Sequence, residues 1–212
     1  MSVKSFSKKE AIKLGWEMTK KNLLFLIGIT FVMGLIQFAP DILGQYTKEQ
    51  DMLSGLIEIA SYIVSIGVTL GSIKIYLNLV DGKKVEFADL FSLFKLNLIG
   101  RYFIASVIYG IAVVLGLFLL ILPGIYIAIK YLFFAYFLVD KEMGIVESFS
   151  KSGEITRDRI WNLFLFGVLI TLVLLLGLIA FGVGIFVAIP VVGLATAYAY
   201  RKLSPVAHHK SA

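Results

Sequence analysis

Long apolar stretches follow one another along the chain and are separated by short, charged connections. A helix needs about 20 mainly apolar residues to cross the hydrocarbon core of a bilayer. Lipid offers no partners for backbone groups, so such uninterrupted stretches predict helices. The sequence therefore predicts an all-α, polytopic membrane helical bundle. Six transmembrane helices are expected, at residues 23–39, about 52–79, 102–122, 124–140, 160–181 and 184–200.

The composition narrows the class of protein. Of the 212 residues, 59% are hydrophobic and 16% are charged, whereas soluble domains have about 45–50% apolar and about 25% charged residues. This excludes an ordinary soluble enzyme and a disordered chain. The sequence has no cysteine, so disulfides and thiolate metal sites are excluded. The net charge of +6 lies beside the apolar stretches, which favours membrane topology over nucleic-acid binding.

The placement of lysine and arginine predicts the orientation. All of the 20 basic residues except Lys48 and Lys130 fall on one side of the six expected spans, together with both chain ends. Positive charge is retained on the cytoplasmic side of a membrane. We therefore expect a multi-pass protein of the cell membrane (plasma or inner), with both termini cytoplasmic and the first span kept as a signal anchor.

The chain also contains an internal similarity. The sequence GIYIAI, which starts at Gly124, returns as GIFVAI, which starts at Gly184. The single membrane domain 1–212 is therefore predicted to contain three parallel repeats, at about 1–82, 83–142 and 143–212. Each repeat would be an interfacial helix followed by a transmembrane hairpin. The alternative is a chance match between two apolar sequences.

The first interfacial helix is predicted between residues 9 and 21. At 100° per residue, Ala11, Ile12, Leu14, Gly15, Trp16 and Met18 share one half of this helix. The basic face on the other half consists of Lys9, Lys13, Lys20 and Lys21. This separation is typical of a helix in the headgroup layer with lysines toward anionic lipid. Its role would be topological anchoring, or recognition of a lipid or a partner protein. The second interfacial helix would pack with Phe87, Leu90, Phe91, Phe94 and Leu98, and the third would cover 145–159.

Several short motifs in the middle and C-terminal parts of the chain point to a family. These are Gly82, Phe87-Ala88-Asp89-Leu90-Phe91, Pro123-Gly124-Ile125-Tyr126, Leu138-Val139-Asp140, and Ser152 followed by Thr156. The chain resembles a broad group of prokaryotic six-span membrane proteins of largely unknown function. The group includes the membrane domain that precedes some glycerophosphoryl diester phosphodiesterases, and related uncharacterised inner-membrane proteins. The resemblance implies the fold and topology but no activity, because phosphodiesterase catalysis belongs to a separate soluble barrel.

Two ionisable residues are expected at membrane depth. Glu58 lies in the second span and Lys130 lies in the fourth, each about seven residues from the outer end. Such a group costs about 2.5–3.5 kcal/mol to insert, so it should face a partner or a wet cavity. An ion pair between Glu58 and Lys130 would relieve both costs. The two groups would then form part of an ion path, Lys130 would bind an anionic lipid headgroup, or the pair would only fix helix packing. Alternatively, the Lys130 side chain extends to the membrane surface.

No nucleophile, metal or nucleotide motif is present, and His208 and His209 alone are too few for a metal site, so we expect no enzyme, cofactor or metal. Beyond Glu58 and Lys130, we expect no repeated polar stripe on any span. The leading hypothesis is therefore a non-enzymatic membrane protein that organises lipid or a partner protein in envelope maintenance. Alternatives are a small solute or ion transporter or channel using Glu58 and Lys130, and an accessory subunit of a separately encoded enzyme. Expected partners are the lipid bilayer, anionic lipid, and a membrane protein or a second copy of the chain.

Overall fold

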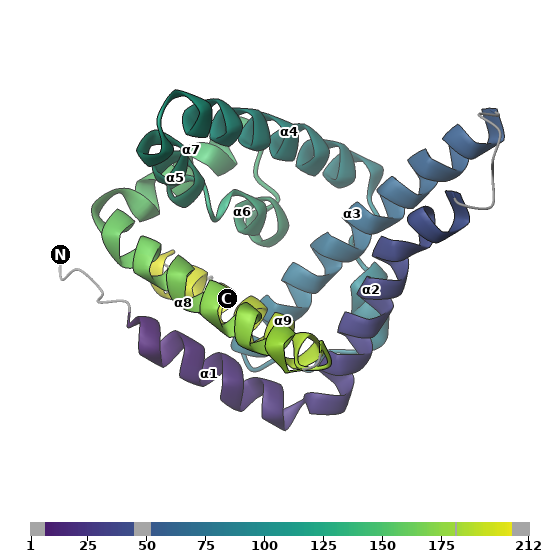
Figure 1. The fold of residues 1–212 in the computed structure, drawn as a ribbon, viewed down its shortest axis with the longest axis horizontal. Coiled ribbons are helices and arrows are strands. Elements are labelled where there is room, and N and C mark those ends of the chain that lie inside the picture. The colour runs from purple at the N-terminus through teal and green to yellow at the C-terminus, as the bar shows by residue number, and fades with distance from the viewer. Residues whose placement is uncertain (1–6, 45–51, 181, 205–212) are drawn as a thin grey trace, which may run out of the picture.

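The computed structural model describes residues 7–44, 52–180 and 182–204, with side chains described for 7–38, 55–180 and 182–204. Lys48, His208 and His209 lie outside these residues. The described chain is helical and contains no strand (Figure 1). Its elements are α1 (Lys8–Lys21), α2 (Leu23–Gly44), α3 (Met52–Val80), η1 (Phe87–Phe91), α4 (Leu96–Leu119), α5 (Ile121–Lys130), α6 (Phe134–Lys141), α7 (Ile145–Thr156), η2 (Arg157–Arg159), α8 (Ile160–Ile179) and α9 (Ile185–Leu203).

The predicted membrane character agrees with the lengths and hydropathy of these helices. Within the described chain, five helical stretches are long and apolar enough to cross a bilayer, and a sixth is added if α1 and α2 are counted as one bent span. The helices α3, α4, α8 and α9 cover most of the predicted second, third, fifth and sixth spans. The protein is thus an all-helical chain with several helices suited to a membrane.

The first two helices meet at a sharp bend. The axes of α1 and α2 differ by 97° across Asn22. The side-chain amide of Asn22 donates a hydrogen bond of 3.0 Å to the carbonyl oxygen of Met18, and so satisfies one carbonyl at the end of α1. The first span is expected at residues 23–39, and the helix that contains it continues through Pro40 to Gly44. Apolar membrane helices tolerate proline in this way.

The predicted fourth span is not one uninterrupted helix. It is divided into α5 and α6 by a turn at residues 131–133. The freed backbone groups are paired by α7: the Ser152 hydroxyl donates to the carbonyl oxygen of Lys130 at 3.1 Å and accepts from the backbone N–H of Phe133 at 3.1 Å. Thr156 Oγ1 lies 2.9 Å from the same carbonyl oxygen. The break is stable because a neighbouring helix replaces the missing helical hydrogen bonds.

The second interfacial helix also differs from its prediction. Instead of an amphipathic α-helix, the chain forms only the short 3₁₀ helix η1, which packs against α3. A Cβ atom added at Gly71 would lie 1.9 Å from the carbonyl oxygen of Leu90. One added at Gly67 would lie 2.5 Å from the ring of Phe94. The two glycines therefore allow this connection to lie directly on α3, as small residues do between membrane helices.

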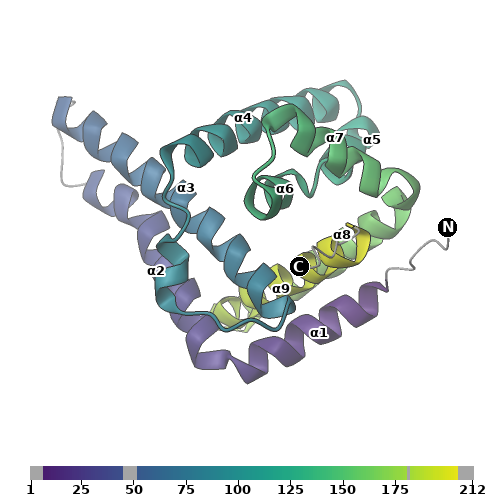
Figure 2. The same cartoon turned by 180° about the vertical axis from the view of Figure 1, so that it is seen from behind.

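The helix α9 is the most buried of the long apolar helices in the described chain. It packs against α1, α2, α3 and α8. In its most apolar stretch 56% of the residues are buried, whereas the corresponding share in α4 is 11%. Gly15 brings α1 onto α9, since a Cβ there would lie 2.4 Å from the carbonyl oxygen of Val191. Both ribbon views show α1 beside α8 and α9 (Figures 1 and 2). Most of the apolar face of α1, predicted to meet lipid, thus packs on the bundle instead, whereas Trp16 on that face is 48% exposed.

Two hairpins turn at pairs of glycines. In the α4–α5 hairpin, a Cβ on Gly116 would lie 2.8 Å from the Cα of Gly124. In the α8–α9 hairpin, a Cβ on Gly177 would lie 2.9 Å from the carbonyl oxygen of Gly184. Large apolar side chains beside both turns are exposed, among them Phe118 at 90%. Surfaces of this kind suit contact with lipid tails.

Candidate functional site

A polar stripe runs along one face of α3. It consists of Glu58, Ser61, Tyr62, Ser65 and Thr69. These positions are separated by one, three or four residues, so at 100° per residue they fall on one side of the helix. The expectation that no span carries a repeated polar stripe is therefore wrong. Four of its five members are uncharged, so charge alone does not reveal the stripe in the sequence.

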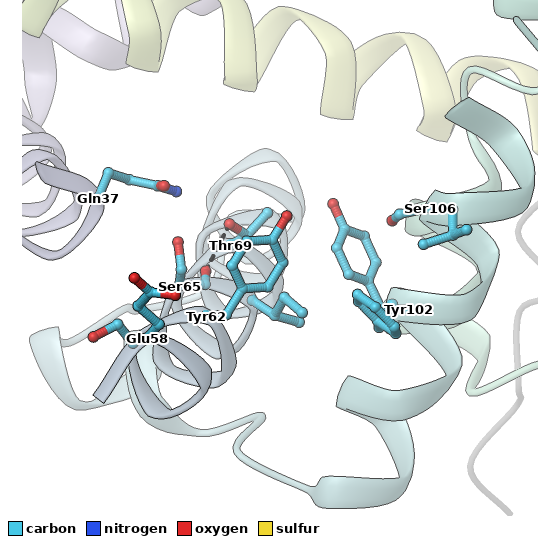
Figure 3. A pocket seen from close by; sticks show the side chains of 11 residues that line it. Gln37, Glu58, Tyr62, Ser65, Thr69, Tyr102 and Ser106 are labelled. Carbon is cyan, nitrogen blue, oxygen red and sulfur yellow. Dashed lines mark hydrogen bonds between the residues drawn. The ribbon is translucent and has the colours of Figure 1, made fainter. Parts of the chain in front are cut away.

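The polar stripe lines a cavity of about 610 Å³, which we call the polar cavity. Gln37 of α2 faces the stripe from one side, and Tyr102 and Ser106 of α4 lie on the other (Figure 3). Along α3 the lining extends from Glu58 to Thr69, which is about 17 Å at 1.5 Å per residue. The cavity volume lies within the range of about 300–1,000 Å³ that is usual for small-molecule sites.

The hydrogen-bonding groups in the polar cavity are only partly satisfied. Thr69 donates its hydroxyl proton to the carbonyl oxygen of Ser65 at 2.9 Å, which keeps this bond within α3. By contrast, the hydroxyl oxygen of Ser106 is buried and forms no hydrogen bond of ordinary geometry with the described residues, although the Tyr102 hydroxyl lies near enough to interact with it. A buried polar atom without a partner costs about 1–3 kcal/mol. A polar ligand or water in the cavity would recover this cost.

Glu58 supplies the negative charge of the polar cavity. Within the described part of the chain, no lysine or arginine forms an ion pair with it. The rings of Tyr62 and Phe103 form an edge-to-face pair with centroids 6.3 Å apart, and both line the same cavity as Glu58. Aromatic faces and a carboxylate both attract cations. The site therefore favours a positively charged ligand.

Lys130 lies elsewhere, and the expected pair with Glu58 is not formed. The ammonium of Lys130 lies 5.7 Å from the ring centroid of Tyr126 and 5.3 Å from that of Tyr131. Its side chain also approaches α7, because a Cβ on Gly153 would lie 3.3 Å from Lys130 Cε. Cation–π contacts of this kind stabilise an ammonium by about 0.5–1 kcal/mol at exposed sites. Lys130 is thus separated from the polar cavity.

The predicted basic face on α1 is exposed. Lys9, Lys13, Lys20 and Lys21 all lie on the outside of the helix. The side chains of α1 that are buried are Ala11 and Thr19, on the opposite face. The ammonium of Lys20 lies 5.6 Å from the ring centroid of Trp16. The four lysines are therefore free of the protein core and available to a negatively charged surface.

An ion-pair network connects three helices, and the sequence analysis did not predict it. The Arg201 guanidinium binds Asp81 with hydrogen bonds of 2.9 and 2.8 Å, and binds Asp140 at 2.7 Å. The Tyr200 hydroxyl also donates to Asp140, at 2.9 Å. Because Arg201 and Tyr200 of α9 bind carboxylates at the ends of α3 and α6, the network holds the ends of these three helices together. Lys141 also lies 3.6 Å from Asp140.

Neither a metal site nor a known relative identifies the protein. No three His, Asp or Glu side chains in residues 7–38, 55–180 and 182–204 are close enough together to hold a metal ion. Comparison with known proteins finds no matching family model, no matching curated protein and no matching solved structure. The polar cavity is therefore the feature of the described residues that points to a function.

Proposed function

We propose that the protein binds a small, positively charged organic solute in the polar cavity and takes part in moving it across the membrane, without catalysis. The observation that carries this proposal is the polar stripe on α3, which puts Glu58 and four hydroxyl-bearing side chains along one cavity. A charged group on an apolar helix is costly unless it meets a partner or a wet space. A cationic solute would provide that partner for Glu58.

The chemistry of the cavity selects an organic cation over a bare metal ion. Metal ions bind to several converging oxygen ligands, whereas the polar cavity contains one carboxylate. Its volume of about 610 Å³ exceeds what a single ion fills. Tyr62, Tyr102 and Phe103 supply aromatic faces, which suit an alkylated ammonium. The hydroxyl groups would accept or donate hydrogen bonds to polar substituents of the solute.

Uptake by proteoliposomes tests this proposal. The purified protein is reconstituted, and uptake of radiolabelled tetramethylammonium is driven by an interior-negative potential. The Glu58→Gln variant should lose about tenfold in rate, because it removes the carboxylate that lines the cavity and attracts the cation. Glu147→Gln is the matched control, since it removes an exposed carboxylate on α7 away from the cavity. Equal uptake by wild type and Glu58→Gln would contradict the proposal.

This proposal departs from the leading hypothesis of the sequence analysis. A role in lipid or partner organisation follows from spans that carry no repeated polar stripe. Since α3 carries such a stripe, the transport alternative gains support through Glu58, although Lys130 takes no part in the site. A role as an accessory subunit would need a partner surface of its own and is not favoured by the cavity.

We further propose that the helices cross the cell membrane six times as three parallel repeats, with both termini cytoplasmic. The glycine contacts Gly116–Gly124 and Gly177–Gly184 support equivalent hairpins in the second and third repeats. The resemblance to the six-span family described above supports the same topology. It also leads us to propose that the chain is a member of that family.

Cysteine labelling tests the orientation cleanly, because the natural chain has no cysteine. Val183, in the turn between α8 and α9, is 71% exposed. Val183→Cys should react with a membrane-impermeant maleimide on intact cells. Lys84→Cys, in the connection between α3 and η1, should react only after the cells are permeabilised. The reverse pattern would overturn the proposed orientation.

A further inference from the structure

An apolar groove of about 580 Å³ lies next to the polar cavity. It is formed where α3 meets the first two turns of α4, and includes Ile63, Ile99 and Gly100. Glu58, Tyr62, Ile66 and Phe103 line both spaces. The edge-to-face rings of Tyr62 and Phe103 therefore stand between a polar and an apolar compartment that meet at the same carboxylate.

This division matches a ligand with two chemically different ends. The polar cavity offers Glu58, hydroxyl groups and the Gln37 amide to a charged head. The apolar groove offers almost entirely aliphatic and aromatic side chains, with Glu58 at its rim. A hydrocarbon chain gains free energy in such surroundings when it leaves water. The charge at Glu58 requires that the head be cationic.

We infer that the ligand of this site is an amphiphilic cation, whose ammonium head binds at Glu58 in the polar cavity and whose alkyl chain occupies the apolar groove. This inference rests on the proposed function and adds the class of substrate. The apolar groove is continuous with the polar cavity at Tyr62 and Phe103, so a single molecule can occupy both spaces. For this reason we assign the groove to the alkyl chain of the same ligand.

Gly100 allows the groove to be filled without disturbing the fold. A Cβ atom added at Gly100 would meet no other atom within 4 Å, so a larger side chain can extend from this position. Gly100 lines the apolar groove but not the polar cavity. Gly110 on the same helix lines neither and is equally open. Gly100→Leu and Gly110→Leu thus form a matched pair of test and control.

The experiment measures equilibrium binding of two probes to the whole protein in phosphatidylcholine nanodiscs, with empty nanodiscs subtracted. The probes are tetramethylammonium and octyltrimethylammonium. Each methylene that leaves water adds about a fourfold gain in affinity. Because the groove is open on one side, we expect about half of the added methylenes to count, giving about 100-fold tighter binding of the octyl probe. Gly100→Leu should reduce this advantage to below about fivefold and leave tetramethylammonium binding within twofold. Gly110→Leu should change neither value.

The outcomes separate this inference from the proposed function. In one outcome, tetramethylammonium binds in a way that depends on Glu58, but the octyl chain adds no affinity, or adds affinity that Gly100→Leu does not reduce. The inference of an amphiphilic ligand is then wrong, and the proposed function stands. If neither probe binds, both are wrong. If the octyl probe binds through the groove but Glu58→Gln has no effect, the groove holds a hydrocarbon chain without a cationic head, and the assignment of the head to Glu58 is overturned.

Discussion

Arg201, at the end of α9, forms two hydrogen bonds with Asp81, which directly follows α3, although 120 residues separate them in the sequence. Both oxygens of the carboxylate are engaged, which is the strongest geometry for an arginine and a carboxylate. The Arg201 side chain is only 15% exposed, so this contact is screened less than a surface pair. The contact fixes the C-terminal end of α9 to the end of α3.

Removing Arg201 should destabilise the protein. In Arg201→Met the carboxylates of Asp81 and Asp140 lose their guanidinium and remain partly buried. We expect a loss of about 2 kcal/mol in the free energy of unfolding, below the full cost of a wholly buried pair because Asp81 is partly exposed. Thermal unfolding in detergent measures the effect. Lys83→Met is the control: its ammonium lies 3.9 Å from Asp81 and is 64% exposed, so its removal should change little.

The break between α5 and α6 should depend on Ser152. Ser152→Ala leaves the backbone N–H of the buried Phe133 without its hydrogen-bond acceptor. This should cost about 1–3 kcal/mol. Ser150→Ala, on the exposed side of the same helix, should have almost no effect. The two variants are compared by their melting temperatures; equal values would show that the Ser152 hydroxyl does not stabilise the break.

The sequence predicted the long helices better than their interruptions and contacts. The apolar lengths of α3 and α8 are local properties, so hydropathy finds them. The break at 131–133 has no local signal, since Tyr131, Leu132 and Phe133 are neither glycine nor proline. Its stability comes from Ser152 and Thr156 on another helix. Contacts between such distant positions depend on the packing of the whole chain, which one sequence does not reveal.

Part of the candidate site was within reach of the sequence. Glu58 was identified from its charge, but the hydroxyl residues on the same face of α3 were not considered with it. Their helical spacing is visible in the sequence, as is the continuation of this face to Ser72 and Tyr76. The expected pairing with Lys130 was wrong because similar depth on two helices does not determine which faces meet.

The glycine contacts of the hairpins should respond in parallel. In Gly177→Ala the new methyl carbon would lie 2.7 Å from the Cβ of Ala188. The helices α8 and α9 must therefore move apart, which should lower the free energy of unfolding by about 1–3 kcal/mol. Gly116→Ala should have a similar effect at the Gly124 contact. At Gly167 and Gly110, on the same two helices, an added Cβ meets nothing within 4 Å. Alanine there should stabilise by up to about 1 kcal/mol through helix propensity. Melting temperatures of the four variants check this, and opposite behaviour of the two hairpins would argue against equivalent repeats.

The basic face of α1 should bind anionic lipid. Replacing Lys9, Lys13, Lys20 and Lys21 together by glutamine removes four exposed positive charges, each worth about 1 kcal/mol near an anionic membrane surface. Native mass spectrometry should show fewer bound phosphatidylglycerol molecules, with unchanged binding of phosphatidylcholine. The melting temperature should change little, because the buried face of α1 is untouched. Undiminished phosphatidylglycerol binding would mean that this face does not recognise anionic lipid.

Glu58 and Lys130 should contribute independently to stability and function. They lie in different surroundings, one in the polar cavity and the other between Tyr126 and Tyr131. Residues that share no contact usually give additive effects within about 0.5 kcal/mol. In a double-mutant cycle with Glu58→Gln and Lys130→Met, the coupling free energy of unfolding should therefore be near zero. Cation uptake should fall in Glu58→Gln and in the double variant alike, and remain in Lys130→Met. A coupling above about 1 kcal/mol would mean that the two groups meet in another conformation of the protein, since a contact between them would be needed to produce it.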